Sequence, residues 1–199
     1  MTPPQPTVAV LVPIKVFSSA KARLAEAVDP AARARLARRM AAGVVRAAHP
    51  LPVWVVCDDD EVAAWAEAHG ANVAWRPVSG LNAAVTAGVE LLAAEGVQRV
   101  IVAHADLPRA RTLAHLADAD PDTVLIVPDR HRDGSNVLVV PTGVGFRFCY
   151  GPGSFRAHVD EAARGGLPAV VVDDPDLAWD VDVPDDLEGV DAILALEDL

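Results

Sequence analysis

Short runs of consecutive apolar residues recur along the first half of the chain, and segments with helical periodicity separate them. The first run, residues 7–15, is rich in valine, and similar runs cover 52–60, 71–77 and 97–106. Continuous apolar runs of this length are typical of strands that are buried on both faces, as in parallel sheets. The pattern therefore predicts a parallel sheet built on these four strands.

The segments between the runs predict helices. The clearest covers residues 29–48, where Asp29 stands at the N-cap and Pro30 at the first helical position. Further helices are expected at 59–70, 80–96, 109–119, 153–166 and 184–199. Strand and helix alternate, which is typical of βα units with helices on both faces of a central sheet.

The second half of the chain breaks this alternation, because the predicted strands 122–129 and 135–142 follow one another without a helix. We therefore expect a mixed sheet, with further strands at 168–174 and 177–182. A length of 199 residues with 52% hydrophobic residues fits one globular α/β domain spanning residues 1–199.

Composition excludes several classes of protein. The formal net charge of −11 is opposite to that of most nucleic-acid binders. The sequence has no apolar run of the ~18 residues that a membrane span requires, and residues 1–15 lack the basic region and cleavage site of a signal peptide. Cys57 and Cys149 are too few for a disulfide scaffold. We expect a cytoplasmic protein that binds neither nucleic acid nor a membrane.

The positive charge is concentrated in one region, since eight of the 17 Lys and Arg residues lie between Lys15 and Arg46. The arginines of helix 29–48 are interpreted as a solvated face. Lys15, Lys21 and Arg23 instead follow the first strand, where parallel sheets commonly bind phosphate. These three side chains could neutralise a triphosphate, although the loop contains no glycine-rich Walker sequence.

Acidic residues follow several of the predicted strands. Asp106 comes directly after strand 97–106, and Asp180 and Asp182 stand two apart in the predicted strand 177–182, with Val181 expected to face the core. Residues i and i+2 of a strand share a face, so these carboxylates should repel each other unless a cation lies beside them. Mg²⁺ commonly uses one or two carboxylates together with substrate phosphates. The alternative is two solvated acids, one of which caps the last helix.

Three further segments are candidates for ligand binding. Ser79, Gly80 and Asn82 open helix 80–96, where an amide could bond a base or ribose; Ser79 as a simple N-cap is the alternative. Ser135 and Asn136 open a strand. Gly151 and Gly153, at the start of helix 153–166, would leave backbone N–H groups free to bind an anion. His158 and His104 are interpreted as structural residues.

Taken together, the segments "VPIK", "SAKARLA", "GLNAAV", "HADLP", "PDRHRDGSNVL", "YGPGSFRAH" and "WDVDVPDDL" resemble the 2-phospho-L-lactate guanylyltransferase family (CofC/FbiD) of coenzyme F-420 biosynthesis, over residues 8–188. The resemblance implies a MobA-like nucleotidyltransferase, with a Rossmann-like three-layer α/β/α sandwich of the GT-A type around a mostly parallel, mixed sheet. It also implies guanosine as the nucleoside. "PIKVFSSAKARLA" replaces the glycine-rich first loop of the broader superfamily.

The same resemblance assigns roles to residues. It implies Mg²⁺ on Asp106, Asp180 and Asp182, and triphosphate contacts from Lys15, Lys21 and Arg23. It implies guanosine near Ser79, Gly80 and Asn82, and the phosphorylated acid near Ser135, Asn136, Gly151, Gly153 and Ser154. Ser135 stands where many members are expected to carry threonine, and the hydroxyl is retained.

The implied reaction transfers GMP from GTP to the phosphate of phosphoenolpyruvate or 2-phospho-L-lactate and releases pyrophosphate. Two alternatives remain open: a related nucleotidyltransferase with another nucleotide or acceptor, and a non-catalytic nucleotide-binding protein. A downstream enzyme of F-420 biosynthesis is an expected partner, and both a monomer and a homodimer are compatible with the sequence.

Overall fold

The computed structural model describes residues 8–19 and 21–189 and has a single mixed sheet as its centre. The strand order is β3-β2-β1-β4-β6-β5-β7. The strands are β1 (Val8–Pro13), β2 (Val53–Cys57), β3 (Asn72–Trp75), β4 (Arg99–Ala103), β5 (Val124–Pro128), β6 (Ser135–Pro141) and β7 (Ala169–Val171). The α-helices within the described ranges are α1 (Pro30–Ala47), α2 (Asp60–Ala68), α3 (Leu81–Ala94) and α4 (Ser154–Arg164).

The apolar runs form the parallel strands β1 to β4, as predicted. β1 lies between β2 and β4 and is parallel to both. β6 runs antiparallel to β4 and β5, which confirms the mixed sheet expected from two strands without an intervening helix. This reversal brings the start of β6 beside the end of β4, where the backbone N–H of His104 donates to the carbonyl of Asn136 at 3.0 Å.

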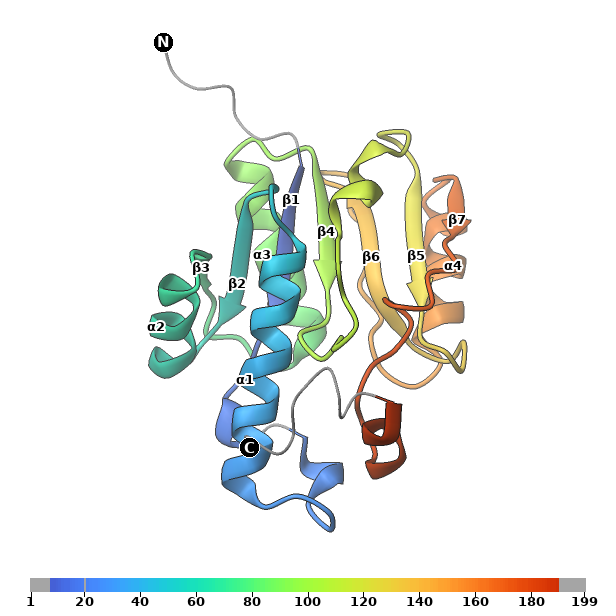
Figure 1. Ribbon diagram of the computed structural model, residues 1–199. Coiled ribbons are helices and arrows are strands. Elements are labelled where there is room, and N and C mark those ends of the chain that lie inside the picture. The colour runs from blue at the N-terminus through green and yellow to red at the C-terminus, as the bar shows by residue number, and fades with distance from the viewer. Residues whose placement is uncertain (1–7, 20, 190–199) are drawn as a thin grey trace.

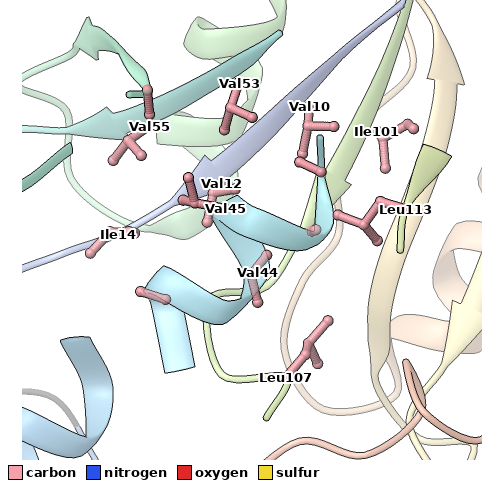
Figure 2. Packing of buried hydrophobic residues seen from close by; sticks show 14 of the residues in the cluster. Val10, Val12, Ile14, Val44, Val45, Val53, Val55, Ile101, Leu107 and Leu113 are labelled. Carbon is pink, nitrogen blue, oxygen red and sulfur yellow. The ribbon is translucent and has the colours of Figure 1, made fainter. Parts of the chain in front are cut away.

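Alternate residues of each central strand pack on opposite faces of the sheet. Val10 and Val12 face α1, where they meet Val44 and Val45 (Figure 2). Ala9 and Leu11 belong to the cluster on the other face, which α3 and α4 cover. The strands are therefore buried on both faces, which explains why they read as continuous apolar runs rather than as alternating ones.

Capping residues set the helix starts. Asp29 caps α1 by accepting the N–H groups of Ala31 and Ala32, with Pro30 at the first helical position, as the sequence predicts. Asp59 caps α2 in the same way. Gly80, with φ of 90°, precedes α3, so the alternative of Ser79 as a simple N-cap is wrong.

Two predicted elements differ from the structure. Segment 109–119 is not an α-helix; only Ala114–Asp118 forms a short 3-10 helix (η3). Residues 177–182 form no strand, so the prediction that Asp180 and Asp182 share a strand face is wrong. Contacts from distant residues hold this stretch instead: Arg130 donates to the carbonyl of Asp180, and Asp186 accepts the N–H of Asp182.

Three short 3-10 segments lie near the carboxyl ends of β1 and β4. They are η1 (Phe17–Ser19) and η2 (Ala22–Leu24), which follow β1, and η4 (Pro184–Gly189), drawn dark red at the lower end of Figure 1. Val181 is fully buried against Leu24, Leu36 and Met40, so its predicted inward orientation is confirmed. Only the start of the predicted helix 184–199 lies within the described residues, where it is η4; residues 190–199 lie outside them. No helix in the described part of the chain is both long and apolar enough to cross a bilayer.

Candidate functional site

A cavity of about 560 Å³ opens at the carboxyl ends of β1 and β4. At this point the chain order across the sheet reverses, which is where ligands bind in open α/β sheets. The lining comes from the loops after β1 and β4, the start of β6, the start of α4 and the segment before η4. Ten predicted site residues line it: Lys15, Lys21, Arg23, Asp106, Ser135, Asn136, Gly151, Ser154, Asp180 and Asp182.

Lys21 is at the centre of the charged side of this cavity. Its ammonium group forms an ion pair with Asp106 and another with Asp182 at 3.1 Å. Arg23 lies 3.4 Å from the second oxygen of Asp182. The backbone of Lys21 has a φ of 55°, in the left-handed region that non-glycine residues seldom adopt. Five residues, called the ionic cluster below, make up this charged side: Lys21, Arg23, Asp106, Asp180 and Asp182.

Burial and charge act against each other within the ionic cluster. Burial opposes the charged form of Lys21, yet the two carboxylates outweigh it and raise the lysine pKa. Burial likewise opposes ionisation of Asp106, but Lys21 and then His104 hold its pKa below the usual value. The pair therefore persists as ammonium and carboxylate, and each charge keeps the other ionised.

Asp180 has no such cation. Burial, followed by repulsion from Asp106 and Asp182, raises the pKa of its carboxyl. The amide nitrogen of Asn136 lies 3.5 Å from the Asp180 carboxylate, a weak contact, and the same nitrogen donates to the carbonyl of Leu177 at 3.0 Å. Three carboxylates thus meet at one place with only a single lysine buried among them.

The carboxylates have the chemistry of a divalent metal site but are not yet arranged as one. In the described ranges 8–19 and 21–189, no three His, Cys, Asp or Glu side chains form a cluster that could hold a metal ion. The ammonium of Lys21 lies between Asp106 and Asp182 instead. One oxygen of Asp106 is buried without a hydrogen-bond partner among the described residues. A second cation would satisfy that oxygen and relieve Asp180, so the donor set fits Mg²⁺.

Neutral side chains on the opposite side of the cavity bond to one another. Ser154 accepts the N–H of Ser135 at 3.1 Å, and both serines are almost fully buried. Both ring nitrogens of His158 form hydrogen bonds. The backbone N–H of Cys149 donates to Nε2 at 2.9 Å, so in the neutral ring Nδ1 carries the proton. Nδ1 then donates to the hydroxyl oxygen of Ser135 at 3.0 Å. Ser135, Ser154 and His158 are called the serine cluster below.

Burial keeps His158 neutral. It is fully enclosed, and burial, with the nearby His104 acting in the same direction, lowers its pKa to about 4. A neutral ring with its proton fixed on Nδ1 leaves the Ser135 hydroxyl hydrogen free of the histidine. Ser135 can therefore donate that hydrogen to an anionic ligand.

The start of α4 is less open to an anion than the sequence suggested. The N–H of Gly153 donates to both carboxylate oxygens of Asp133 at 3.2 Å, and the N–H of Phe155 donates to the Asp133 carbonyl. The N–H of Ser154 donates to the Gly151 carbonyl at 3.0 Å. Gly153 also lies outside the residues that line the cavity. The prediction that the Gly153 and Ser154 amides receive a ligand directly does not fit these bonds.

Asn82 also has a different environment from the predicted one. Its side-chain oxygen accepts the N–H of Tyr150 at 2.7 Å, and its nitrogen donates to the Tyr150 carbonyl at 3.1 Å. Both ends of the amide therefore hold the chain before α4. Ser79, Gly80 and Asn82 do not line the main cavity, whereas the adjacent Leu81 does.

A second, smaller cavity of about 240 Å³ adjoins the first at the ends of β1 and β2. Pro13, Ile14, Lys15 and Leu81 line both cavities. The remainder of the smaller lining is contributed mainly by apolar residues of β2 and α3, with Asp58 and Arg76 as charged members. Space for a ligand thus continues from the ionic cluster towards the start of α3.

Two residues beside the site were given no role from the sequence. Asp186 is only 2% exposed and accepts the backbone N–H groups of Asp182 and Val183. Arg130, at the end of β5, forms an ion pair with Asp186. The sequence gives little indication of their role, because Asp186 is one of two adjacent acids in "VPDDL" and Arg130 is one of several charged residues in "PDRHRD".

Comparison with known proteins gives a consistent picture. The family model described as "Guanylyl transferase CofC like" matches residues 8–194. A phosphoenolpyruvate guanylyltransferase of Chloroflexus aggregans is 36% identical over 188 residues, covering 88% of this chain and 92% of that protein. A protein of the same name from Rubrobacter xylanophilus is 35% identical, covering 92% of each.

Solved structures with the same fold are more distant in sequence. A putative nucleotide-diphospho-sugar transferase from Desulfovibrio desulfuricans superposes with a TM-score of 0.72 at 16% identity, covering 96% of this chain and 97% of that one. A nucleotidyl transferase from Methanothermobacter thermautotrophicus gives 0.63 at 17% identity, covering 95% and 98%. These likenesses confirm the predicted α/β nucleotidyltransferase fold.

Proposed function

The chain belongs to the CofC-like family of guanylyltransferases, and we propose that it transfers GMP from GTP to phosphoenolpyruvate, with release of pyrophosphate, in coenzyme F-420 biosynthesis. The observation that carries this proposal is the convergence of basic and acidic side chains in one cavity, at the reversal point of a nucleotidyltransferase sheet. Such a site suits a reaction that brings two phosphorylated anions together.

The choice of acceptor rests on the relatives. Those from Chloroflexus aggregans and Rubrobacter xylanophilus carry phosphoenolpyruvate in their names. 2-Phospho-L-lactate has the same phosphate and carboxylate on a reduced carbon skeleton and is the second acceptor to test. Both acids place two anionic groups close together, which matches a cavity that offers a hydroxyl donor on one side and cations on the other.

Mg²⁺ is the cofactor that fits the carboxylates, and Asp106, Asp180 and Asp182 are the residues that would hold it. The unpartnered oxygen of Asp106 and the uncompensated charge on Asp180 both favour an added cation. When bound, the ion would offset the negative charge of the phosphates and of the departing pyrophosphate.

Lys21 then has to exchange partners. In the structure the Lys21 ammonium pairs with both Asp106 and Asp182. Lys15, the other lysine that lines the cavity, is exposed. With those carboxylates holding a metal ion, Lys21 would be able to pair with phosphate oxygens of GTP, together with Arg23 and Lys15. The ammonium would lie where charge builds up on the triphosphate during transfer.

Guanosine would extend into the smaller cavity beside Lys15 and Leu81. Its mainly apolar lining suits a base ring, with a few polar groups to orient it. Ser79 and Gly80 precede Leu81 and lie close enough in the chain to border the nucleoside. Asn82 would support this region indirectly, by holding Tyr150, rather than by bonding the base.

The acceptor would lie between the ionic cluster and the serine cluster. Ser135, oriented by His158, would donate its hydroxyl hydrogen to the carboxylate or phosphate, and Gly151 and Ser154 would close the same side of the cavity. The acceptor phosphate is already an anion and attacks the α-phosphorus of GTP in line, so no general base is required. Catalysis here means alignment and neutralisation of charge.

A pyrophosphate-release assay tests the proposal. GTP is supplied with phosphoenolpyruvate, 2-phospho-L-lactate or 3-phosphoglycerate in the presence of Mg²⁺, and CTP replaces GTP in the matched control. Pyrophosphate released with GTP and phosphoenolpyruvate, and not with CTP, is the expected result. Release with CTP alone would reject guanylyl transfer, and release only with 2-phospho-L-lactate would reject the acceptor.

A further inference from the structure

Residues 180–182, called the acidic segment here, hold two like charges on a stretch of chain without regular secondary structure. A strand or helix would fix the direction of its side chains through backbone hydrogen bonds, but this segment lacks that support. The two carboxylates stand only two positions apart, and like charges at such a distance repel each other. Something outside the segment has to hold the two carboxylates in place.

Asp186 holds the end of the acidic segment. One of its carboxylate oxygens accepts the backbone N–H of Asp182 at 2.6 Å and that of Val183 at 2.8 Å. Two N–H donors to one carboxylate oxygen fix the turn that leads from the acidic segment into η4. The same buried carboxylate forms an ion pair with Arg130, so a cation and two N–H donors compensate its burial.

Arg130 holds the start of the acidic segment. One terminal nitrogen pairs with the other oxygen of Asp186, and the second donates to the backbone carbonyl of Asp180 at 3.2 Å. The guanidinium group also lies over the Trp179 ring, 4.4 Å from its centroid. A single buried ion pair therefore binds the carbonyl of the first residue and the N–H of the last residue of the acidic segment.

From these contacts we propose that Arg130 and Asp186 are positioning residues that set the spacing of the Asp180 and Asp182 carboxylates for the metal ion. The proposal rests on the metal role assigned above. A buried ion pair contributes little net stability compared with apolar residues of similar volume. We therefore assign this pair the role of fixing the conformation of the acidic segment. Groups that orient metal ligands without touching the metal commonly change metal affinity by about 10- to 100-fold when they are replaced.

Neighbouring residues offer matched controls. Arg132 is two positions from Arg130 and also lies over an aromatic ring, that of Phe155, but it pairs with the exposed Asp173. Asp185 directly precedes Asp186 and is exposed. Both control residues are of the same types as the proposed positioning residues and lie in the same loops, yet within the described part of the chain neither bonds to the acidic segment.

The experiment measures metal binding apart from turnover. Arg130→Lys and Asp186→Asn are compared with Arg132→Lys and Asp185→Asn, using Mn²⁺ binding followed by electron paramagnetic resonance. The apparent Mg²⁺ constant for pyrophosphate release and the thermal midpoint are measured on the same samples. We expect Mn²⁺ to bind Arg130→Lys about tenfold more weakly than the parent, because lysine cannot donate to Asp186 and Asp180 at once. Both control variants should stay within about twofold of the parent.

Loss of folding is separated from loss of positioning by a paired variant. Arg130→Met combined with Asp186→Leu leaves no unpaired buried charge and should keep the thermal midpoint near that of the parent. Its Mn²⁺ affinity should still fall about tenfold or more. If the single and paired variants bind Mn²⁺ as the parent does, whatever their midpoints, the proposal is overturned.

The metal role itself has a different signature. Asp182→Asn should weaken Mn²⁺ binding directly. If Asp182→Asn binds Mn²⁺ like the parent, or if the parent neither binds Mn²⁺ nor needs Mg²⁺ for turnover, then the assignment of the carboxylates fails and the proposal for Arg130 and Asp186 fails with it. If only the Arg130 and Asp186 variants match the parent, the carboxylate assignment stands and the positioning role alone is rejected.

Discussion

The ionic cluster and the serine cluster occupy opposite sides of one cavity, and they are held together in different ways. Ser135, Ser154 and His158 are buried and bonded to one another and to the backbone. Lys21 and Asp106 are held by opposite charges that a phosphate or a metal ion could replace. The serine cluster is complete before a ligand binds, whereas the ionic cluster has to be rearranged by its ligands.

The largest expected effect breaks the ionic cluster at a carboxylate. Asp106→Asn removes a negative charge that Lys21 and the proposed metal both need, and kcat/KM for pyrophosphate release should fall by a factor on the order of 10² or more. Thermal stability should change little, because Lys21 keeps its bond to Asp182. Asp118→Asn, an exposed acid in η3, is the control. A fall in kcat/KM of less than about threefold would show that Asp106 takes no part in the reaction.

The next effect lies in the serine cluster and concerns stability rather than turnover. The pKa of His158 is about 4 in the folded protein and ordinarily about 6.5, so the unfolded chain binds the extra proton first as pH falls. The stabilisation from keeping the ring neutral is fully present above pH 6.5 and is lost between about 6.5 and 4, amounting to about 3 kcal/mol.

Urea unfolding of the parent and of His158→Asn across pH 7 to 4.5 measures this difference. The parent should lose stability more steeply than the variant in that interval, because asparagine has no proton to gain. Equal slopes would show that His158 takes up its proton at the same pH in the folded and the unfolded protein, contrary to its burial and its bonds with Ser135 and Cys149.

The smallest expected effect comes from removing the buried cation of the ionic cluster. Lys21→Met takes away the ammonium that pairs with both Asp106 and Asp182 and leaves only the exposed Arg23 beside Asp182, so Mn²⁺ in the absence of nucleotide should bind about tenfold more tightly, about 1.4 kcal/mol. Turnover with GTP should fall at the same time, since the triphosphate loses a partner. Weaker Mn²⁺ binding by Lys21→Met would mean that the lysine arranges the carboxylates for the metal instead of competing with it.

The features predicted correctly from the sequence are those that depend on neighbouring residues or on the sheet. Asp29 with Pro30 marks the start of α1, and valine-rich runs give β1 to β4, because capping and burial on two faces leave local patterns. Lys21, Asp106 and Asp182 meet because they all follow the carboxyl ends of strands or lie in the tail that crosses them.

The errors arise where distant contacts decide the conformation. "LAWDVD" has the composition of a strand, yet Arg130 and Asp186 hold the acidic segment in an irregular form. Asn82 looked available to a nucleoside, but the backbone of Tyr150, 68 positions away, uses both of its polar atoms. A side chain's partner across the fold cannot be inferred from spacing along one chain.

The order of the cavity segments along the chain has a consequence for synthesis. The last strand of the sheet, β7, ends at Val171, while Asp180, Asp182 and Asp186 follow it. A nascent polypeptide that has emerged as far as Val171 already contains the seven strands of the described sheet, yet Lys21 and Asp106 would still await their remaining acidic partners. The ribosome would therefore release the strands of the sheet before the acidic residues that are proposed to hold the metal.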